Sequence, residues 1–229
     1  MKFLTYILPI LITTVARGQT APPAEWFGIN VLVHLKNKME WSNEFGYRTF
    51  TSSFMRYQHF ARFSLRYHAF ANTSLATGLS FFNTRQSLEE RETEFGYEFR
   101  LHEEIVNTQA LSSSLALLNR LRVEQRFMQS TSQREAHLKH RGRYQIVLQW
   151  KFQERWFLSP ALEYMAALDK NMLTMDQLRL LTWLSFNPSW QYRITLGIHY
   201  HIRPQYNQMV YQFLFIKSIG KHDHHHQTS

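Results

Sequence analysis

The chain has no cysteine among its 229 residues. This absence excludes a disulfide framework, a metal site built on thiolates and an N-terminal cysteine that could carry a lipid anchor. The sequence also contains no phosphate-binding loop, dinucleotide fingerprint, zincin motif or internal repeat. No motif therefore points directly to a reaction or a cofactor.

Long apolar runs are missing after residue 18, so no spanning helix is expected in the body of the chain. Residues 1–18 are typical of a secretory signal peptide. Lys2 gives a positive start, residues 3–15 form an apolar core, and Ala16-Arg17-Gly18 makes a cleavage site. The alternative is a membrane anchor, but such a helix needs about 20 apolar residues, more than this run supplies. We expect cleavage before Gln19.

The sequence has no concentrated basic tract, although its formal net charge is +9. A basic balance often indicates nucleic acid or an anionic membrane as a partner. Here the cations are mostly arginines spaced along the whole chain, and no nucleic-acid-binding motif accompanies them. We therefore interpret the positive charge as part of the architecture and expect no nucleic acid partner.

Charged and apolar residues alternate with a period of two from Glu40 to Phe215, which is the signature of β-strands. The clearest stretch sets four charged residues against apolar neighbours: Arg120, Arg122, Glu124 and Arg126 against Leu121, Val123 and Phe127. Eleven stretches are expected as strands: residues 25–35, 39–50, 56–70, a small-residue strand between 73 and 83, 92–102, 114–127, 141–152, 156–166, 176–186, 190–203 and 206–219.

The connections between these strands alternate in length. Residues 72–73, 153–154 and 187–189 make tight turns, whereas 83–91, 128–139 and 167–174 are long and polar. This alternation of short turns and long loops is typical of outer-membrane barrels. Two features fit less well: the connection from residue 101 to 114 is long for its place, and eleven is odd where bacterial barrels have even strand numbers.

Four tryptophans lie within a few residues of the tight turns, and we expect them to form an aromatic girdle at one rim: Trp41, Trp150, Trp156 and Trp190.

A soluble barrel shows the same alternation of polar and apolar residues, so we use the type of cation to distinguish a membrane barrel from a soluble one. The cations within strands are almost all arginine, whereas Lys36, Lys38, Lys139 and Lys170 fall in turns or loops. A confined interior favours arginine, because its planar fork binds carboxylates in a bidentate manner. We therefore predict an all-β fold: a single closed antiparallel transmembrane β-barrel of roughly ten to twelve strands with a lumen filled by Arg and Glu. A secreted soluble barrel or sandwich that binds a ligand is the alternative.

The expected organisation is a signal peptide over residues 1–18, a leader over 19–25, the barrel over 26–219 and a flexible His-rich tail over 220–229. Location in the outer membrane of a Gram-negative bacterium follows, with outer-membrane lipids and the barrel-assembly machinery as partners. No solute is identified.

The residues from Trp26 to about Phe215 resemble domain of unknown function 2490, an uncharacterised family of bacterial outer-membrane barrels common in Bacteroidetes-type genomes. The segments that carry the resemblance are Trp26, residues 44–48, Leu65 with Tyr67, Glu98 with Arg100, residues 120–127, residues 141–144, Glu163 with Tyr164, and Asp176 with Gln177 and Arg179. The resemblance implies a fold and a location but no catalytic residues. One departure is that such barrels usually end on an aromatic residue, whereas here residues 216–229 follow Phe215.

The inward-facing charges are the candidate site. They are Glu40, Glu44, Arg48, Arg62, Arg66, Glu98, Arg100, Arg120, Arg122, Glu124, Arg126, Arg143, Glu163, Arg179 and Arg193. The favoured interpretation is a structural network that plugs the lumen, because barrels of about eight strands are filled by side chains and about 16 are needed for an open channel. The alternative is a narrow or gated path that attracts anions.

An outer-membrane lipid-modifying enzyme is a further alternative. No His-x-Ser or Ser-x-His pair occurs, but Ser64 and His68 with a carboxylate could assemble across strands. A non-enzymatic role is favoured, and no catalytic residue is assigned. His199 and His201 share one strand face, but without a third ligand we expect no metal site and no cofactor.

Overall fold

The computed structural model describes residues 19–51, 56–86, 94–132, 135–169 and 172–220. The expected signal peptide, residues 221–229 of the His-rich tail and residues 87–91 of the expected loop 83–91 lie outside these ranges. The described chain is built of strands. None of its segments forms a helix long and apolar enough to cross a bilayer.

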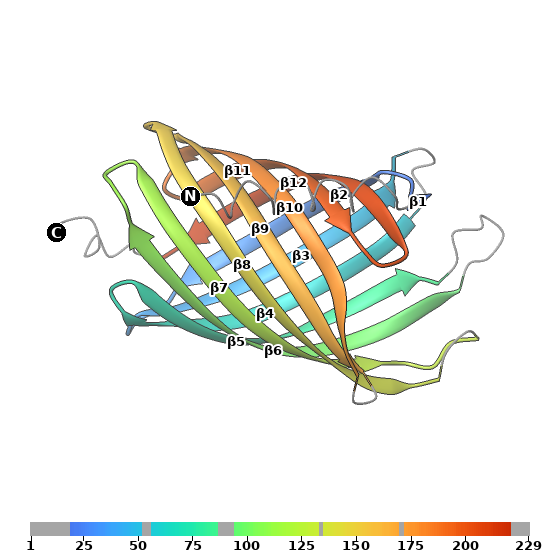
Figure 1. Ribbon diagram of the computed structural model, residues 1–229. Helices are drawn as coiled ribbons and strands as arrows, with labels where there is room; N and C mark the ends of the chain where they lie inside the picture. Colours follow the sequence, from blue (N-terminus) through green and yellow to red (C-terminus); the bar gives the residue numbers. More distant parts are fainter. Residues whose placement is uncertain (1–18, 52–55, 87–93, 133–134, 170–171, 221–229) are drawn as a thin grey trace, which may run out of the picture.

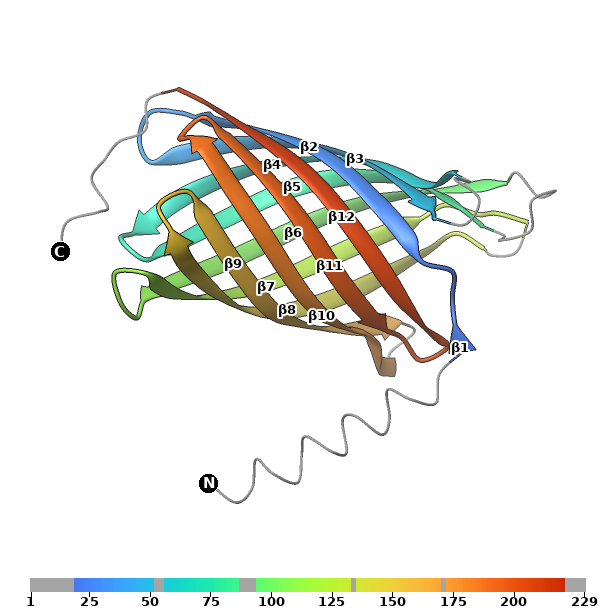
Figure 2. The same ribbon diagram turned by 90° about the horizontal axis from the view of Figure 1, so that it is seen from above.

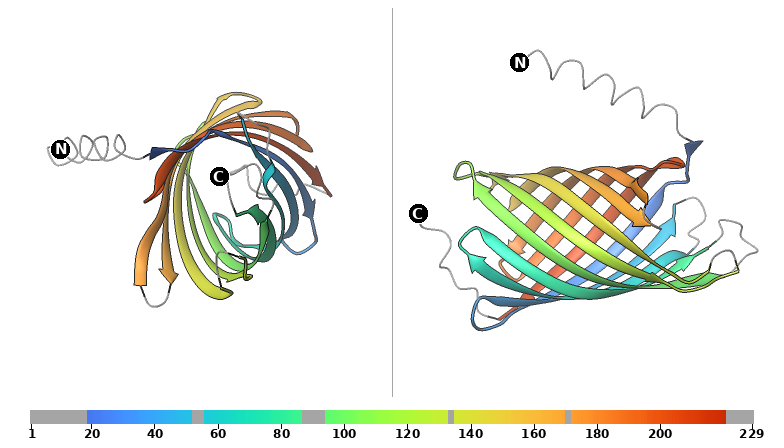
Figure 3. Two further views of the ribbon diagram at one scale, coloured as in Figure 1. Left: turned by 90° about the vertical axis from the view of Figure 1, so that its right-hand side faces the viewer. Right: turned by 60° about the horizontal axis from the view of Figure 1, so that its bottom comes forward.

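Eleven of the strands close into one barrel (Figures 1 and 3). In chain order they are β2 (Ala24–His34), β3 (Met39–Phe50), β4 (Arg56–Phe70), β5 (Thr73–Arg85), β6 (Phe95–Ala110), β7 (Leu115–Met128), β8 (His137–Gln153), β9 (Trp156–Asp169), β10 (Met172–Ser189), β11 (Tyr192–Ile202) and β12 (Tyr206–Ile219). Each pairs with its sequence neighbours in antiparallel fashion. The predicted closed all-β barrel is confirmed.

The closing pair, β12 with β2, is parallel rather than antiparallel. The odd strand number is the cause. Hairpin-connected strands alternate in direction, so the first and the eleventh run the same way and must meet in parallel. Val210 pairs with Ala24 at one end of this seam and Ile219 with Val33 at the other.

The expected leader over residues 19–25 is part of the sheet. The two-residue strand β1 (Gln19–Thr20) pairs in parallel with the start of β12, and the Ala21 amide donates to the Asn207 carbonyl at 2.8 Å. Pro22 and Pro23 then interrupt the ladder, because proline has no N–H to donate. β2 begins directly after them.

Apolar side chains cover the outside of the barrel, and charged side chains are buried inside it. Among the exposed apolar residues are Phe27, Phe45, Phe81, Leu121, Tyr164 and Ile198. Among the buried charged residues are Glu98, Glu104, Arg122, Glu124, Arg143 and Glu163. Buried apolar residues form only a small cluster around Ala24, Phe50 and Val210. This polarity is the reverse of that of a soluble barrel.

The connections gather at two ends of the barrel (Figure 2). One, here called the turn end, carries residues 35–38, 71–72, 111–114, 154–155 and 190–191. The other, here called the loop end, carries the described residues 51, 86, 94, 129–132, 135–136 and 203–205, and β1 also lies there.

Three predicted connections are wrong because strands continue through them. The expected long connection from 101 to 114 is mostly β6, which reaches Ala110 and leaves a turn of residues 111–114. The expected loop 167–174 consists largely of β9 and β10, which pair up to Asp169 and Met172. The expected turn 187–189 belongs to β10.

Candidate functional site in the barrel lumen

Glu163 on β9 is the centre of the lumen charges. Its carboxylate accepts hydrogen bonds from Arg120 at 2.7 Å, Arg143 at 2.6 Å and Arg179 at 3.2 Å, and the residue is 1% exposed. Arg120 comes from β7, Arg143 from β8 and Arg179 from β10. Arg120 reaches over β8, since Gln145 lies between it and Glu163 in the register. One buried carboxylate therefore ties four consecutive strands together.

Glu124 on β7 is a second shared carboxylate. It accepts hydrogen bonds from Arg141 at 2.9 Å and Arg143 at 2.8 Å. Arg141 also donates to Asp176 at 3.2 Å. Asp176 lies at a register shift between β10 and β9. Such a bulge sets one residue out of the alternation, so Asp176 reaches a lumen arginine from a position that strict alternation would direct outward.

Glu104 and Glu98 on β6 accept hydrogen bonds from further arginines. Glu104 accepts hydrogen bonds from Arg122 at 2.8 Å and Arg66 at 2.8 Å. Arg100 and Arg126 lie directly opposite each other on β6 and β7, where two like charges repel. Both donate to Glu98, Arg100 at 2.7 and 2.9 Å and Arg126 at 3.2 Å. The carboxylate offsets that repulsion.

Two less buried pairs join β3 to β4. Arg62 donates to Glu44 at 2.7 Å. Glu40, near the turn end, is 3.9 Å from Arg66 and 3.4 Å from His34. With these pairs, ion pairs join every inward-facing charge predicted from the sequence except Arg48 and Arg193.

Arg48 and Arg193 have no carboxylate within 4.0 Å among the described residues. The Arg48 guanidinium lies over the Trp26 ring at 3.7 Å and is 4.8 Å from the Phe60 centroid. Arg193 lies near the turn end, is exposed, and donates to Asn187 at 3.0 Å. Arg48 also donates to the side-chain oxygen of Gln58, so it is a lumen cation held by aromatic rings and an amide rather than by an acid.

Sequence reasoning missed four members of the network: Glu104, Lys139, Arg141 and Asp176. Lys139 was expected in a loop, but it lies on β8 with its Nζ 3.5 Å from an Asp176 oxygen. Glu104 was missed because β6 was expected to end at His102, although the alternation continues through Glu104 and Val106. Arg141 has the same strand phase as Arg143, so the period of two was sufficient to find it. Asp176 depends on the bulge and carries no such signal.

A cavity of about 510 Å³ lies inside the lumen. Its walls include network residues such as Glu44, Arg120 and Glu163, and it reaches loop-end residues such as Gln86 and Tyr206. Of the predicted charges, those absent from its wall are Glu40, Arg66, Arg122, Glu124 and Arg193. The cavity is thus a cup on the loop-end side of the charge network.

His199 and His201 are buried in the lumen wall on β11, 2% and 0% exposed. The His199 ring makes edge contacts with Trp26 at 5.8 Å and Trp183 at 5.4 Å. Within the described part of the chain, no group of three side chains could hold a metal ion.

The structure does not bring Ser64 and His68 together. Both lie on β4, four residues apart, which corresponds to about 13 Å along a strand. That separation is too long for the hydrogen bond between nucleophile and base that acyl transfer requires.

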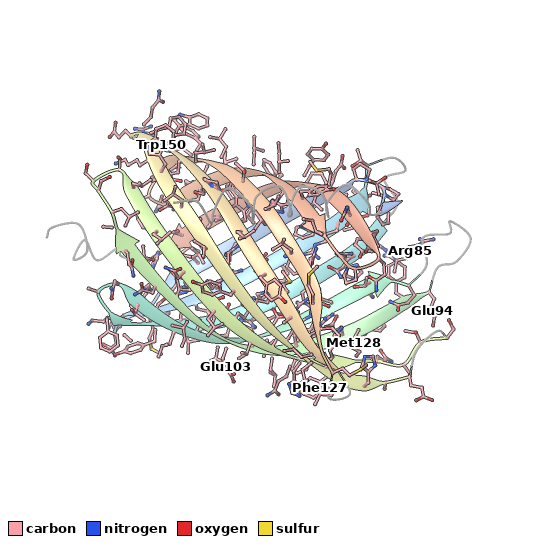
Figure 4. All side chains as sticks on the ribbon, in the orientation of Figure 1. Arg85, Glu94, Glu103, Phe127, Met128 and Trp150 are labelled. Atoms are coloured by element: carbon pink, nitrogen blue, oxygen red, sulfur yellow. The ribbon has the colours of Figure 1, made fainter. Side chains whose placement is uncertain are left out.

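The four tryptophans of the expected girdle all lie at the turn end. Trp41, Trp150 and Trp190 are exposed, and Trp156 packs against Phe186 at 4.7 Å. Trp150 lies at the opposite end of the barrel from Arg85 and Glu94 (Figure 4).

At the loop end, Ser132 makes two hydrogen bonds to Glu94. The Ser132 amide donates to the Glu94 carboxylate at 2.7 Å, and the Ser132 hydroxyl donates as well. These hydrogen bonds favour the ionised carboxylate and lower the pKa of Glu94 from its ordinary value. The contact joins the connection that follows β5 to the one that follows β7.

In a comparison with known families, the family described as "Protein of unknown function (DUF2490)" matches residues 24–225. No curated protein matches the chain. The matched range contains all eleven barrel strands, and the family resemblance expected from the sequence is confirmed.

Proposed function

Because the chain belongs to the DUF2490 family, which assigns it no activity, we propose a function from its geometry. The protein is an outer-membrane β-barrel of a Gram-negative bacterium, its lumen is closed to the passage of solutes, and its role is not enzymatic. The observation that carries the proposal is the set of buried carboxylates, led by Glu163, that hold arginines across the lumen.

The reversed polarity supports a membrane location. Exposure of an apolar outer face to water is unfavourable, whereas its contact with lipid is favourable. Strands such as β6 (Phe95–Ala110) and β8 (His137–Gln153) exceed the roughly 9 to 11 residues that cross a bilayer. An aromatic girdle at the turn end matches the place of such residues at a membrane interface.

The ion pairs support a closed lumen. They link β3 to β4 and β6 through β10 in sequence, and Arg66 on β4 reaches past β5 to Glu104 on β6. Trp26 on β2 contacts Arg48 on β3 and His199 on β11. A barrel of eleven strands is closer to the eight-strand size that side chains fill than to the roughly 16 strands of open porins. Large arginine side chains from most strands fill much of the cross-section, and the 510 Å³ cavity lies on their loop-end side.

Short connections lie on the periplasmic side of bacterial barrels and long ones outside. The turn end is therefore assigned to the periplasm and the loop end to the exterior. In this orientation the lumen cup opens outward, and the start of β1 also lies on the outer side.

Recording from the purified barrel in planar bilayers tests the closed lumen. We expect no large steady conductance steps. A Glu163→Ala variant, which frees three arginines to move, should conduct more than the wild type if Glu163 closes the path. Large, steady, anion-selective steps from the wild-type barrel would contradict the proposal and establish an anion path.

A further inference from the structure

Buried nitrogen atoms without a hydrogen-bond partner gather at one place in the lumen. Among the described residues they include Trp26 Nε1, Arg48 Nε, Gln177 Nε2, Arg179 Nε and both ring nitrogens of His199 and of His201. Buried polar groups are nearly always hydrogen-bonded, so one such atom needs an explanation. A cluster of them indicates a site for a group that accepts hydrogen bonds.

These side chains surround the Trp26 ring. Arg48 lies 3.7 Å and Arg179 5.7 Å from its centroid, and the rings of His199 and His201 are 5.8 and 5.2 Å away. They project from four different strands, β2, β3, β10 and β11. The arrangement therefore depends on the closed fold and not on one local segment.

The cluster is positively charged. Arg48 has no carboxylate partner among the described residues, and Arg179 shares Glu163 with Arg120 and Arg143. A buried cation without a counter-charge is costly, and an anion placed beside it removes that cost.

The cluster also has access. The 510 Å³ cavity is lined by Trp26, Arg48, Gln177, Arg179 and His199, and its wall continues to the loop end. Its volume falls within the roughly 300 to 1,000 Å³ of small-molecule sites. A metabolite-sized anion fits this cup, whereas a fatty acyl chain would meet a predominantly polar wall.

We propose that this cluster binds the phosphate group of a small molecule that enters from the loop end. Arg48 and Arg179 supply the charge, and the Trp26 indole, the Gln177 amide and one ring N–H of His199 supply further donors. Phosphate is favoured over carboxylate because it offers more acceptor oxygens to so many donors. The proposal goes beyond the closed barrel and needs only the fold, so it stands or falls separately from the conductance result.

The test is calorimetric titration of the full-length barrel in non-ionic detergent, at fixed ionic strength, with inorganic phosphate, glucose 6-phosphate and acetate. We expect saturable binding of at least one of the two phosphates and a higher thermal midpoint in its presence. If glucose 6-phosphate binds more tightly, the ligand is an organic phosphate. Equal affinity indicates phosphate itself.

Arg48→Gln should weaken binding roughly tenfold or more, because it removes a charged donor. Arg193→Gln is the matched control: it removes another arginine without a carboxylate, outside the cavity wall, and should leave the affinity unchanged. If Arg48→Gln does not fold, Trp26→Phe keeps the aromatic ring, removes the N–H and should weaken binding several-fold.

Three outcomes would overturn the proposal. They are no saturable binding of either phosphate, tighter binding of acetate than of phosphate, and equal loss of affinity in Arg48→Gln and Arg193→Gln. The last would indicate general attraction to a basic protein.

Discussion

At Glu163 three guanidinium groups share one carboxylate that is 1% exposed. Desolvation makes each of these charges costly, and only their mutual pairing offsets that cost. The complete group of Glu163 and its three arginines therefore adds little to the free energy of unfolding. Removing the carboxylate is strongly destabilising, because three buried cations then remain without their counter-charge.

Glu163→Gln should therefore lower the free energy of unfolding by roughly 3 to 5 kcal/mol. The change is measured by urea unfolding in detergent, with the heat-dependent shift in gel mobility as the readout of the folded fraction. Glu154→Gln, in an exposed turn, is the control and should stay within about 0.5 kcal/mol of the wild type. An unchanged midpoint for Glu163→Gln would mean that this carboxylate faces water.

Glu103 is an exposed charge on the outer, apolar face (Figure 4). It lies near the middle of β6, between Thr77 on β5 and Val123 on β7, with Leu101 and Ile105 beside it. A lipid-facing charge destabilises a barrel, although less for an acid than for Arg or Lys.

Glu103→Leu should thus raise the free energy of unfolding in lipid bilayers, by up to about 2 kcal/mol. Thr77→Leu, which removes no charge, serves as the comparison. A loss of stability in Glu103→Leu would contradict a lipid-facing position and indicate that another protein covers Glu103.

At the scale of elements, close strand approach depends on Gly78 in β5. A Cβ there would come within 2.3 Å of the Phe63 carbonyl oxygen and 2.6 Å of the His102 ring. The Phe63 carbonyl belongs to the backbone, so it cannot move away from an added Cβ as the end of a flexible side chain could. Gly142 in β8 differs, because a Cβ there meets nothing within 4 Å.

Gly78→Ala should destabilise the barrel by roughly 1 to 3 kcal/mol through overpacking. Gly142→Ala should be neutral or slightly stabilising, since alanine restricts the unfolded chain. Thermal midpoints of the two variants, measured side by side, decide the matter. Equal midpoints would mean that β4, β5 and β6 are spaced more widely than described.

Strand patterning was largely predictable from the sequence, and the network's connections were not. Period-two alternation located β3, β4 and β12 with their exact bounds. It ended β6 too early, at His102, because the two neighbouring acids Glu103 and Glu104, one outward and one inward, hid the alternation that continues through them. It also carries no information on reach across strands, so the bond from Arg120 past β8 to Glu163 could not be foreseen.

At the scale of the whole molecule, the odd strand number places the two ends of the barrel sheet on opposite sides. β1 lies at the loop end, and β12 finishes at Ile219 at the turn end. In an outer membrane this arrangement puts Ala21 on the same side as the long loops and opposite the turn at Glu154. The absence of cysteine from the sequence makes the topology open to single-cysteine labelling.

The most direct measurement is labelling of single-cysteine variants in intact cells with a charged, membrane-impermeant maleimide. The account predicts that Ala21→Cys and Glu135→Cys react, that Glu154→Cys reacts only after the outer membrane is permeabilised, and that lipid-facing Val123→Cys stays unreactive in native membranes. Rapid labelling of Val123→Cys in native membranes, or recovery of the protein from the soluble periplasm, would contradict an outer-membrane barrel.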